Sequence, residues 1–487
     1  MDLPEFNSLG PCQVSFSLAN EQNLACEEVV RVVPGKRIVC RGQWRNQEVY
    51  AKIFIGPQAQ RYAGRDKRGM LALASASIPS PNLLYAGHSL EGQAEVLIYA
   101  SVSDSVNAEQ LWDALPIHSA ERFELAKKIV TAVAVHHNAG LLQTDLYLKN
   151  FLVQGEQVFT LDGDAIRRIP RIFSQRAALN NLALLLSKFD VEDESEWLSL
   201  LLAVYAVTRK DAYVLNVSDM QKRIATIRHR VSRKYADKKV FRECTEVKVA
   251  HSLSAFFAVS RAYFSTQLDV ALNEPDRLLD ADHYPRLKDG NTCTVGLTEI
   301  DSRKVVIKRY NIKSFWHGLG RAFRQSRAAI SWANAHRLQM HEIATASPIA
   351  LIERRFGPIR RQAFFLAEYV DAKDVQEFFA DSLIEQEQKQ AVALNIARLF
   401  RKLYLLNISH GDFKASNVKV VGTQPLLIDL DSMQEHSCRW CFERHHVRDL
   451  RRFLQNWAQD KETRNLLAQA FGKFYKDPRP LQQAGWL

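Results

Sequence analysis

The sequence has no apolar run long enough to cross a lipid bilayer as a helix, which takes about 20 residues. The longest run, residues 198–207, has ten residues and includes Ser and Tyr. The first residues, MDLPEFNSLG, show neither the basic nor the apolar region of a secretory signal. Cysteine is also scarce: seven are scattered along the chain, an odd number that predicts reduced thiols rather than a disulfide framework. These absences predict a cytoplasmic protein.

The composition is that of a globular protein with more than one domain. A chain of 487 residues corresponds to two or three ordinary domains. With 47% hydrophobic and 24% charged residues, it can bury full cores, which excludes a disordered or collagen-like chain. The formal net charge of +11 predicts an anionic partner without identifying it.

The positive charge is concentrated in two stretches. Residues 222–242 contain nine Lys or Arg against one acid, and residues 302–341 contain nine and no acid. The second stretch also contains Phe315, Trp316 and Phe323. Basic and aromatic residues together suit an anionic membrane surface, or single-stranded nucleic acid. We rank the membrane surface above nucleic acid; the structural alternative is a solvated helix face with a few buried rings.

Two segments, residues 140–164 and 407–431, carry the same spacing of acidic and amide side chains. In each, an Asp is followed by an Asn five residues later and by a second Asp 17 residues later, and the sets are 267 residues apart. A helical pattern precedes each set, and two short strands follow each Asn. This order is typical of the catalytic and metal-binding loops of kinases. The sets are Asp145, Asn150 and Asp162 in the first copy, and Asp412, Asn417 and Asp429 in the second.

A lysine on a predicted strand precedes each set. EVYAKIFI contains Lys52 and KVVIKRY contains Lys308, at 93 and 104 residues before the first Asp of each copy. These distances leave room for the rest of a β-rich lobe and a hinge. A loop Asp taken singly is usually an Asx turn or a helix cap, but the duplicated constellation reverses that interpretation.

Phosphoryl transfer needs its reacting groups to be positioned and their charge to be neutralised. We predict that the first Asp of each set orients the attacking hydroxyl, that the Asn and the second Asp bind Mg²⁺, and that the strand Lys holds phosphates of ATP. The predicted catalytic residues are Asp145, Asp412 and Lys414; the predicted nucleotide-binding residues are Lys52, Lys308 and, in the hinge, Glu368 and Val370; the predicted metal ligands are Asn150, Asp162, Asn417 and Asp429.

The second copy is the better match to a catalytic site. It has His410 two residues before its Asp and Lys414 two residues after it, where kinases often carry a charge for the γ-phosphate. The first copy has Gln143 and Tyr147 at these positions. We expect His410 to be a buried histidine that binds the backbone, not a base.

Several features of protein kinases are missing. Neither copy has a clear G-x-G-x-x-G segment, and no A-P-E follows the second Asp of either set. The Glu that kinases carry on the helix after the strand Lys is not evident; its place falls near Asp66 in the first copy and near Ser331 in the second. Protein-kinase activity is therefore disfavoured.

At these residues the chain resembles the lipopolysaccharide kinase (Kdo/WaaP) family. The resemblance covers nearly the whole chain as two tandem copies, and it implies ATP, Mg²⁺ and action at the cytoplasmic face of the inner membrane of a Gram-negative bacterium. The implied acceptor is a heptose or Kdo hydroxyl of lipopolysaccharide, or of its lipid A-core glycolipid. The matching segments are TDLYLKNFLV in the first copy, and VIKRYN, SRAAISWANAHRL, HGDFKASN, LLIDLD and RDLRRFLQNW in the second.

The predicted fold class is α+β, with two tandem protein-kinase-like bilobal domains at residues 1–250 and 251–487. Each would have a β-rich N-lobe and a helical C-lobe. We expect residues 302–341, with Phe315 and Trp316, to face the acceptor and an anionic membrane, through Arg321, Arg324 and Arg327.

Two other functions stay open. One is a tandem pseudokinase or scaffold in lipopolysaccharide core assembly, which the missing glycine-rich loops and Gln143 favour for the first copy. The other is a soluble small-molecule kinase resembling aminoglycoside phosphotransferases, which share H-G-D-x-x-x-x-N; the acid-free basic stretch argues against it.

Two smaller features remain to be interpreted. Cys438, Cys441 and His445 form a C-x-x-C-x-x-x-H pattern that could ligate zinc, although one such pattern is a weak signal. Asp449 either anchors the catalytic loop of the second copy from below or forms a surface pair with Arg452.

Overall fold

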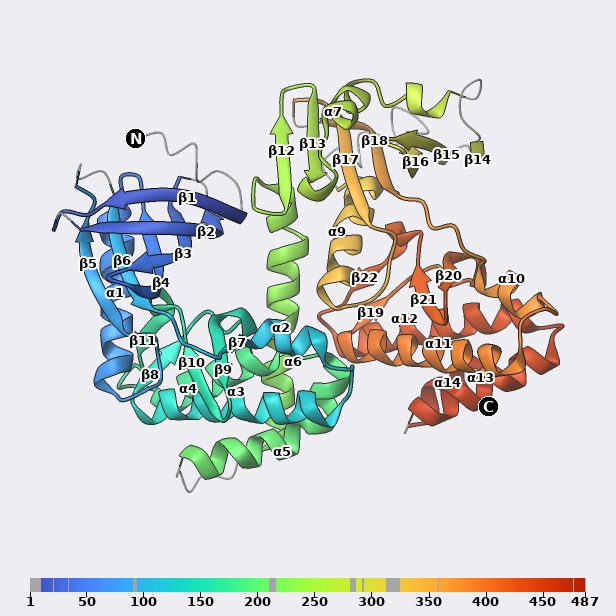
Figure 1. The fold of residues 1–487 in the computed structure, drawn as a ribbon. Helices are drawn as coiled ribbons and strands as arrows, with labels where there is room; N and C mark the ends of the chain where they lie inside the picture. Colours follow the sequence, from blue (N-terminus) through green and yellow to red (C-terminus); the bar gives the residue numbers. More distant parts are fainter. Residues whose placement is uncertain are drawn as a thin grey trace. The chain divides into compact units, whose positions relative to one another are not determined.

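The computed structural model describes residues 10–486, except residues 21, 34, 91–93, 210–215, 281–285, 291–292, 312–324, 358 and 476. Contacts divide the chain into two compact units (Figure 1). The first is Met1–Phe189 with Asp193–Ile227, and the second is Asp190–Glu192 with Arg228–Leu487. The division falls inside helix α6 (Val217–Ala236). The predicted boundary at residues 250 and 251 lies within β12 of the second unit, and the assignment of domains there stays a prediction.

The first unit begins with a six-stranded antiparallel sheet in the order β1-β2-β3-β4-β6-β5. Burial alternates along β3, as expected for a strand with one face in a core. One face is filled by buried residues such as Cys40 and Val49, and helix α1 (Ala59–Ser75) packs Met70 and Leu73 into a further cluster with Phe54. The strands are β1 (Gly10–Ser17), β2 (Asn23–Val33), β3 (Arg37–Trp44), β4 (Gln47–Phe54), β5 (Leu83–His88) and β6 (Glu95–Ala100).

The rest of the first unit is mainly helical. Helix α3 (Ala120–Asn138) buries Leu125, Ile129 and Val133, the residues whose spacing predicts this helix. The other elements are the helices α2 (Ala108–Ala114), α4 (Ser174–Leu186) and α5 (Val191–Arg209), and the short strands β7 (Val106–Asn107), β8 (Leu141–Gln143), β9 (Phe151–Gln154), β10 (Gln157–Thr160) and β11 (Ile166–Arg168).

The second unit repeats this order. Its seven-stranded sheet runs β12-β13-β17-β18-β16-β15-β14, and helix α9 (Arg327–Met340) follows the strand that carries Lys308. Ser326 caps α9 by accepting a hydrogen bond from the backbone N–H of Ala329, and Trp332 is fully buried. The strands are β12 (Val247–His251), β13 (Ala255–Ser260), β14 (Arg286–Gly290), β15 (Cys293–Ile300), β16 (Arg303–Tyr310), β17 (Pro348–Phe356) and β18 (Ile359–Glu368).

Helices and short hairpins form the remainder of the second unit around one large core. Helix α11 ends at Leu406 because Asn407 adopts the left-handed conformation, with φ of 56°, and the predicted catalytic loop follows. The elements are α7 (Thr266–Asn273), α10 (Val375–Ala380), α11 (Gln386–Leu406), α12 (Arg439–Leu454), α13 (Lys461–Phe474), α14 (Arg479–Ala484), β19 (Ile408–Ser409), β20 (Val418–Val421), β21 (Gln424–Leu427) and β22 (Gln434–Glu435). The α+β prediction is confirmed, and each unit has a β-rich and a helical part (Figure 1).

Helix α1 contacts the predicted metal loop of the first unit closely through two glycines. A Cβ on Gly69 would lie 1.9 Å from the carbonyl oxygen of Gly163. We therefore expect Gly69→Ala to lower the free energy of unfolding by about 2 kcal/mol or more, because backbone must shift. Gly64 in the same helix is a matched control: a Cβ there meets only the Arg68 guanidinium, at 3.5 Å.

Gly64→Ala should raise stability by about 0.5–1 kcal/mol, because Ala is the better helix former. Thermal unfolding of the two variants beside the original chain measures both effects. Stabilisation by both substitutions would contradict the close contact between α1 and Gly163.

Candidate active site

The second unit brings the predicted catalytic residues together at the end of α11. The side-chain amide of Asn417 donates hydrogen bonds to the backbone oxygen of Asp412, at 2.9 Å, and to its Oδ2, at 3.4 Å. Lys414 Nζ lies 3.5 Å from Asp412 Oδ2, and Arg452 Nε lies 3.6 Å from Oδ1. The Asp412 side chain is 40% exposed, so an acceptor hydroxyl can reach it.

Asp449 on α12 anchors this loop from below. Its Oδ2 accepts from the backbone N–H of His410 at 2.7 Å, and its Oδ1 accepts from that of Gly411 at 3.0 Å. His410 is buried, and its Nε2 lies 3.1 Å from the backbone oxygen of Ile428. Both the anchoring role of Asp449 and the backbone-binding role of His410 are thus confirmed. The alternative pair of Asp449 with Arg452 is not formed, since Arg452 lies beside Asp412.

Burial raises the pKa of Asp449 to about 6, although the N–H groups of His410 and Gly411 oppose the shift. A carboxyl whose pKa is higher in the folded state than its ordinary 3.8 binds more protons when folded. Its contribution to stability is therefore fully present below pH 3.8 and is lost as the pH rises to about 6. The loss is on the order of 3 kcal/mol, since one pKa unit corresponds to about 1.4 kcal/mol.

We expect Asp449→Asn to remove this dependence, because Asn does not titrate. Between pH 4 and pH 7 the unfolding free energy of the original chain should fall relative to that of the variant, measured by denaturant unfolding at each pH. Asp477→Asn is a control without this dependence: hydrogen bonds from Arg479 lower the pKa of Asp477 below its ordinary 3.8, so its contribution should stay nearly constant between pH 4 and pH 7. A constant difference between the original chain and Asp449→Asn would contradict the assignment.

The predicted metal loop begins at Asp429, directly after β21. Asp429 has φ of 62° and ψ of 60°, a left-handed conformation that Asp and Asn adopt more readily than other non-glycine residues. Its Oδ1 accepts a hydrogen bond from Lys308 Nζ at 3.0 Å. Burial raises the pKa of Asp429, but the charge and hydrogen bond of Lys308, together with His410 and Arg327, outweigh it and the net pKa is lowered. Lys308 on β16 is therefore in direct contact with the predicted metal loop.

Helix α9 contacts the same loop through residues that the sequence did not single out for this role. Arg327 Nη2 donates to Asp431 Oδ2 at 2.6 Å, and the side-chain amide of Asn334 donates to the backbone oxygen of Leu430 at 2.9 Å. Among the described residues, α9 brings no carboxylate to Lys308, and Ser331 instead bonds the hydroxyl of Tyr310 at 3.1 Å. The only feature of the sequence that could have indicated this contact is the arginine at the start of the predicted helix.

The predicted hinge of the second unit joins β18 to α10. The backbone N–H of Glu368 donates to Ser347 at 3.0 Å, and the N–H of Tyr369 donates to Lys304 at 3.0 Å. Val370 accepts from the N–H of Ala372 in a turn. The segment is thus held by backbone bonds, and its contact with a nucleotide stays a prediction.

The first unit arranges its strand lysine differently. Lys52 Nζ donates to Asp66 Oδ2 on α1 at 2.7 Å, and lies 3.5 Å from Asp162 Oδ1. Asp66 is fully buried, and its Oδ1 accepts from the Tyr99 hydroxyl at 2.6 Å. Burial raises the pKa of Asp66 even with Lys52 beside it. Asp66 therefore supplies the helix acid whose place the sequence suggested, one methylene shorter than the Glu of kinases.

The catalytic loop of the first unit keeps one feature of its counterpart. The side-chain amide of Asn150 donates to the Asp145 backbone oxygen at 2.8 Å and to its Oδ2 at 3.1 Å. Gln143, in the place of His410, is buried, and in the described part of the chain its side-chain amide has no hydrogen-bond partner. The side-chain amide of Asn181 on α4 donates to the backbone oxygen of Gln143. In the second unit Asp449 instead accepts from two backbone N–H groups of the loop.

In both units an arginine of the helix that follows the lysine strand binds the Asp two residues after the predicted metal ligand, which is Asp164 in the first unit and Asp431 in the second. Arg65 Nη2 donates to Asp164 Oδ2 at 2.8 Å in the first unit, as Arg327 does to Asp431 in the second. The arginines come from different positions of their helices, so the pairing could not be read from the repeat.

The second unit fits a magnesium ion. Its Asn417 uses the amide nitrogen on Asp412, which leaves the amide oxygen as a ligand, and the Asp429 side chain is 34% exposed. Mg²⁺ prefers such oxygen ligands. In the first unit the corresponding Asp162 Oδ1 is buried and lies within 4.0 Å of both Lys52 and Arg37, at 3.5 Å and 3.9 Å. Both cations also lie within 4.0 Å of Asp66, but two fixed cations this close to the ligand oxygen of Asp162 do not fit a divalent ion.

The zinc pattern does not converge on one point. Cys438 caps α12 by accepting from the N–H of Cys441, and Nδ1 of His445 lies 2.9 Å from the backbone oxygen of Cys441. Across the described residues, no group of three or more His, Cys, Asp or Glu could hold a metal ion.

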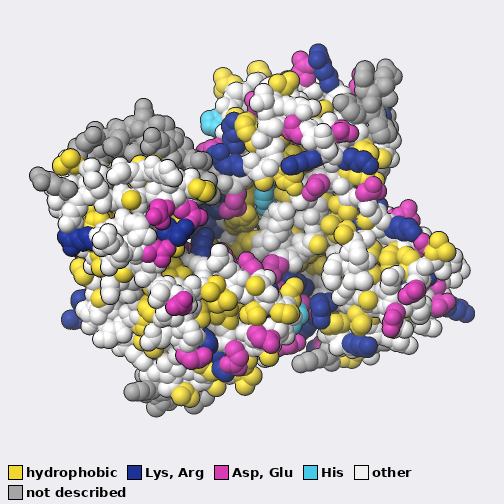
Figure 2. All heavy atoms as spheres, viewed as in Figure 1, with side chains coloured by type: hydrophobic (Ala, Val, Ile, Leu, Met, Phe, Trp, Pro, Cys, Tyr) yellow, Lys and Arg dark blue, Asp and Glu magenta, His cyan; other side chains and the backbone are white. Residues whose placement is uncertain are grey.

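The basic stretch 302–341 is only partly a free surface. Arg321, Arg324, Phe315, Trp316 and Phe323 lie outside the described residues. Arg337 is 5% exposed and bonds Glu435 at 3.1 Å, so it cannot face an acceptor; the acid that neutralises it comes from elsewhere in the chain. On the face drawn in Figure 2, Lys and Arg are interspersed with Asp and Glu. None of the helices in the described ranges is long and apolar enough to span a membrane.

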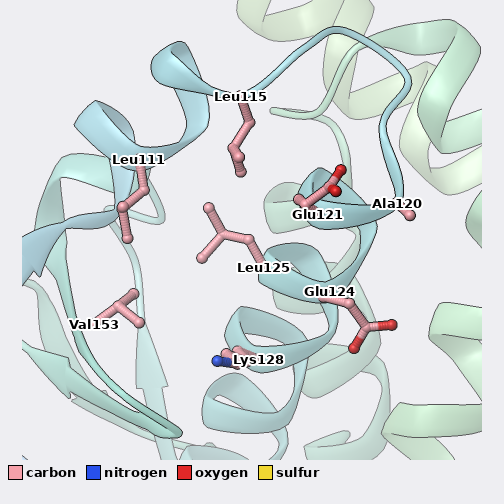
Figure 3. Close-up of a pocket in the computed structure, with 8 residues that line it drawn as sticks. All are labelled: Leu111, Leu115, Ala120, Glu121, Glu124, Leu125, Lys128 and Val153. Carbon is pink, nitrogen blue, oxygen red and sulfur yellow. The ribbon is translucent and has the colours of Figure 1, made fainter.

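A pocket of about 380 Å³ lies in the first unit between α2, the loop after it, α3 and β9 (Figure 3). Leu111, Leu115, Leu125 and Val153 point toward one another in it, while Glu124 and Lys128 lie at its side. None of the predicted site residues lines this pocket.

The match to a known protein family lies in the second unit. Residues 284–475 match the model of the lipopolysaccharide kinase (Kdo/WaaP) family, which confirms the predicted resemblance over these residues. None of the curated proteins matches the chain.

Solved structures of kinases align with about half of the chain. WaaP in complex with acyl carrier protein is 16% identical, with 46% of this chain and 95% of that chain covered and a TM-score of 0.34. The vaccinia related kinase 3 structure is 10% identical, with coverages of 47% and 94% and a TM-score of 0.29. A mutant form of the PknI kinase domain of Mycobacterium tuberculosis is 14% identical, with coverages of 47% and 100% and a TM-score of 0.30.

Proposed function

We propose that the second unit transfers the γ-phosphoryl group of ATP to a sugar hydroxyl, heptose or Kdo, of the inner core of lipopolysaccharide. The observation that carries the proposal is the convergence of Lys308, Asp429, Asn417 and Asp412 within the segment that matches the lipopolysaccharide kinase family.

Each residue has a role that its position supports. Asp412 is exposed and held by Asn417, so it orients the acceptor hydroxyl and receives its proton. Lys414, beside Asp412, neutralises charge on the γ-phosphate, and Lys308 holds the α- and β-phosphates. Bound Mg²⁺ would neutralise the developing phosphate charge, with Asp429 and Asn417 as its ligands. Glu368 and Val370 place the nucleotide at the hinge.

The first unit keeps Lys52, Asp145 and Asn150 in a corresponding arrangement, and we assign it a regulatory rather than a catalytic role. Two differences support this. Asp162 has φ of −109°, in contrast to the left-handed Asp429, and Asn181 replaces the carboxylate that anchors the catalytic loop of the second unit.

Transfer is tested by incubating the full chain with labelled ATP, Mg²⁺ and lipopolysaccharide whose inner-core sugars lack phosphate. Mass spectrometry of the core should show one added phosphate on heptose or Kdo. Label on an aminoglycoside but not on lipopolysaccharide would favour the small-molecule kinase. Absence of label on both acceptors would favour a pseudokinase or scaffold.

The acceptor is part of an anionic glycolipid, and we propose that the chain works at the cytoplasmic face of the inner membrane. The acid-free stretch 302–341 supports contact with anionic lipid. Replacing both Arg321 and Arg324 with Gln should weaken binding to anionic vesicles about 30-fold, since each charge near such a surface contributes about 1 kcal/mol. Vesicle sedimentation measures this. Arg327 is left unchanged because it bonds Asp431.

Neutral vesicles are the control, and neither chain should bind them tightly. Equal binding of the original chain and the double variant to anionic vesicles would contradict a membrane role for these arginines.

A further inference from the structure

The two units differ at one position of the sheet beside the strand lysine. Arg37 on β3 is paired with Phe54, two residues after Lys52. In the second unit the same register position, paired with the residue two after Lys308, is Cys293. The repeat thus places a guanidinium in the first site where the second site has a thiol.

Arg37 is directed at the carboxylates of the first site. Its Nη1 lies 3.9 Å from Asp162 Oδ1 and 4.0 Å from Asp66 Oδ2. Its guanidinium lies 5.8 Å from the centre of the Phe54 ring, and the side chain is 15% exposed. Packing and two ion pairs therefore hold the charge of Arg37 in place.

The negative charge of Asp162 is balanced by cationic side chains of the protein. The oxygen Oδ1 is buried, receives no hydrogen bond from the described residues, and lies 3.5 Å from Lys52 and 3.9 Å from Arg37. A magnesium ion bound by this oxygen would lie about 2 Å from it and hence close to both cations. Their repulsion opposes its binding, and it is weakly screened because the Lys52 and Arg37 side chains are only 13% and 15% exposed. In the second unit Asp429 has Lys308 alone as a cation at this distance among the described side chains.

We propose that Arg37 takes the place of the divalent metal in the first unit, so that Asp162 is the counter-ion of a fixed guanidinium and not a magnesium ligand. The identity of one sheet residue, Arg37 or Cys293, then decides which unit binds metal. The inference rests on the proposed function only in treating the second unit as the metal-dependent one. It makes the first unit a kinase-like module whose site is closed to metal-assisted phosphoryl transfer.

The proposal is tested by measuring Mn²⁺ binding to the full chain by electron paramagnetic resonance in the presence of ADP. Asp429→Ala should abolish Mn²⁺ binding, because the first site takes none. Adding Arg37→Ala to Asp429→Ala should create one Mn²⁺ site, which Asp162→Ala then removes. Adding Arg37→Lys instead should create none, because the charge is kept.

The reciprocal substitution, which introduces an arginine at position 293 of the second unit, does not depend on the stability of the first unit. Cys293→Arg should weaken Mn²⁺ binding at least tenfold, while Cys293→Ala should leave it unchanged. Near-ultraviolet circular dichroism checks that each variant is folded. The proposal is overturned if Asp429→Ala still binds Mn²⁺ in a manner that depends on Asp162, or if Cys293→Arg binds like the original chain. Failure to phosphorylate lipopolysaccharide would leave these metal measurements unchanged, so the two failures are distinguishable.

Discussion

Replacing Asp412 with Asn should lower kcat for phosphoryl transfer by about 10³-fold, within the range that general-base catalysis contributes. Asn keeps the shape of the side chain and a hydrogen bond with Asn417, but it cannot accept the proton of the acceptor hydroxyl. Nucleotide affinity should change little, because Lys308 and Asp429 remain. Steady-state transfer to lipopolysaccharide and equilibrium nucleotide binding measure the two quantities separately.

Asp145→Asn is the matched control. Asp145 has the same bond with Asn150 as Asp412 has with Asn417, so the two substitutions perturb their loops alike. If the second unit is the catalyst, Asp145→Asn should change kcat less than about twofold, as expected for a residue outside the reacting site. A large loss in Asp145→Asn with full activity in Asp412→Asn would place catalysis in the first unit.

Asp429→Asn should lower kcat/KM for ATP by about 10³-fold or more, because it removes the carboxylate that holds metal against the phosphates. Asn tolerates the left-handed backbone conformation of this position, so the loop should keep its shape. The activity that remains should have lost most of its dependence on Mg²⁺ concentration. Kinetics at varied Mg²⁺ and constant ATP measure both changes.

Asp162→Asn provides the comparison at the corresponding position of the first unit. It removes a counter-ion of Lys52 and Arg37, so we expect a loss of stability without a change in the Mg²⁺ dependence of transfer. An unchanged Mg²⁺ dependence in Asp429→Asn, or its loss in Asp162→Asn, would contradict the assignment of the metal to the second unit.

The contacts within the predicted catalytic loops follow from the sequence because they are local. Asp412 and Asn417 are five residues apart and bond each other within one loop, and the same is true of Asp145 and Asn150. A short interval restricts the distance between two side chains whatever the rest of the fold does. The strand that carries Lys308 can also be predicted from its local alternation of side chains. The contact between Lys308 and Asp429 could not, because it depends on the arrangement of the sheet relative to the loop.

The basic stretch shows where prediction from sequence stops. A run without acids predicts an exposed positive surface, yet Arg337 is buried against Glu435, 98 residues away in the chain. Arg327 likewise meets Asp431, 104 residues away. Whether a charge is solvated or paired depends on contacts between distant segments, which composition does not contain.

The sequence by itself determined that the chain holds two segments with the same kinase-like spacing, and that the second matches the kinase pattern more closely, because short spacings and residue types suffice for both. Only the tertiary structure decided which side chains surround each metal-loop carboxylate. Arg37 lies 125 residues before Asp162 and reaches it because β3 places it two residues past Lys52 in register. Electrostatic energy depends on distance in space, and that distance is set by the packing of sheet, helix and loop.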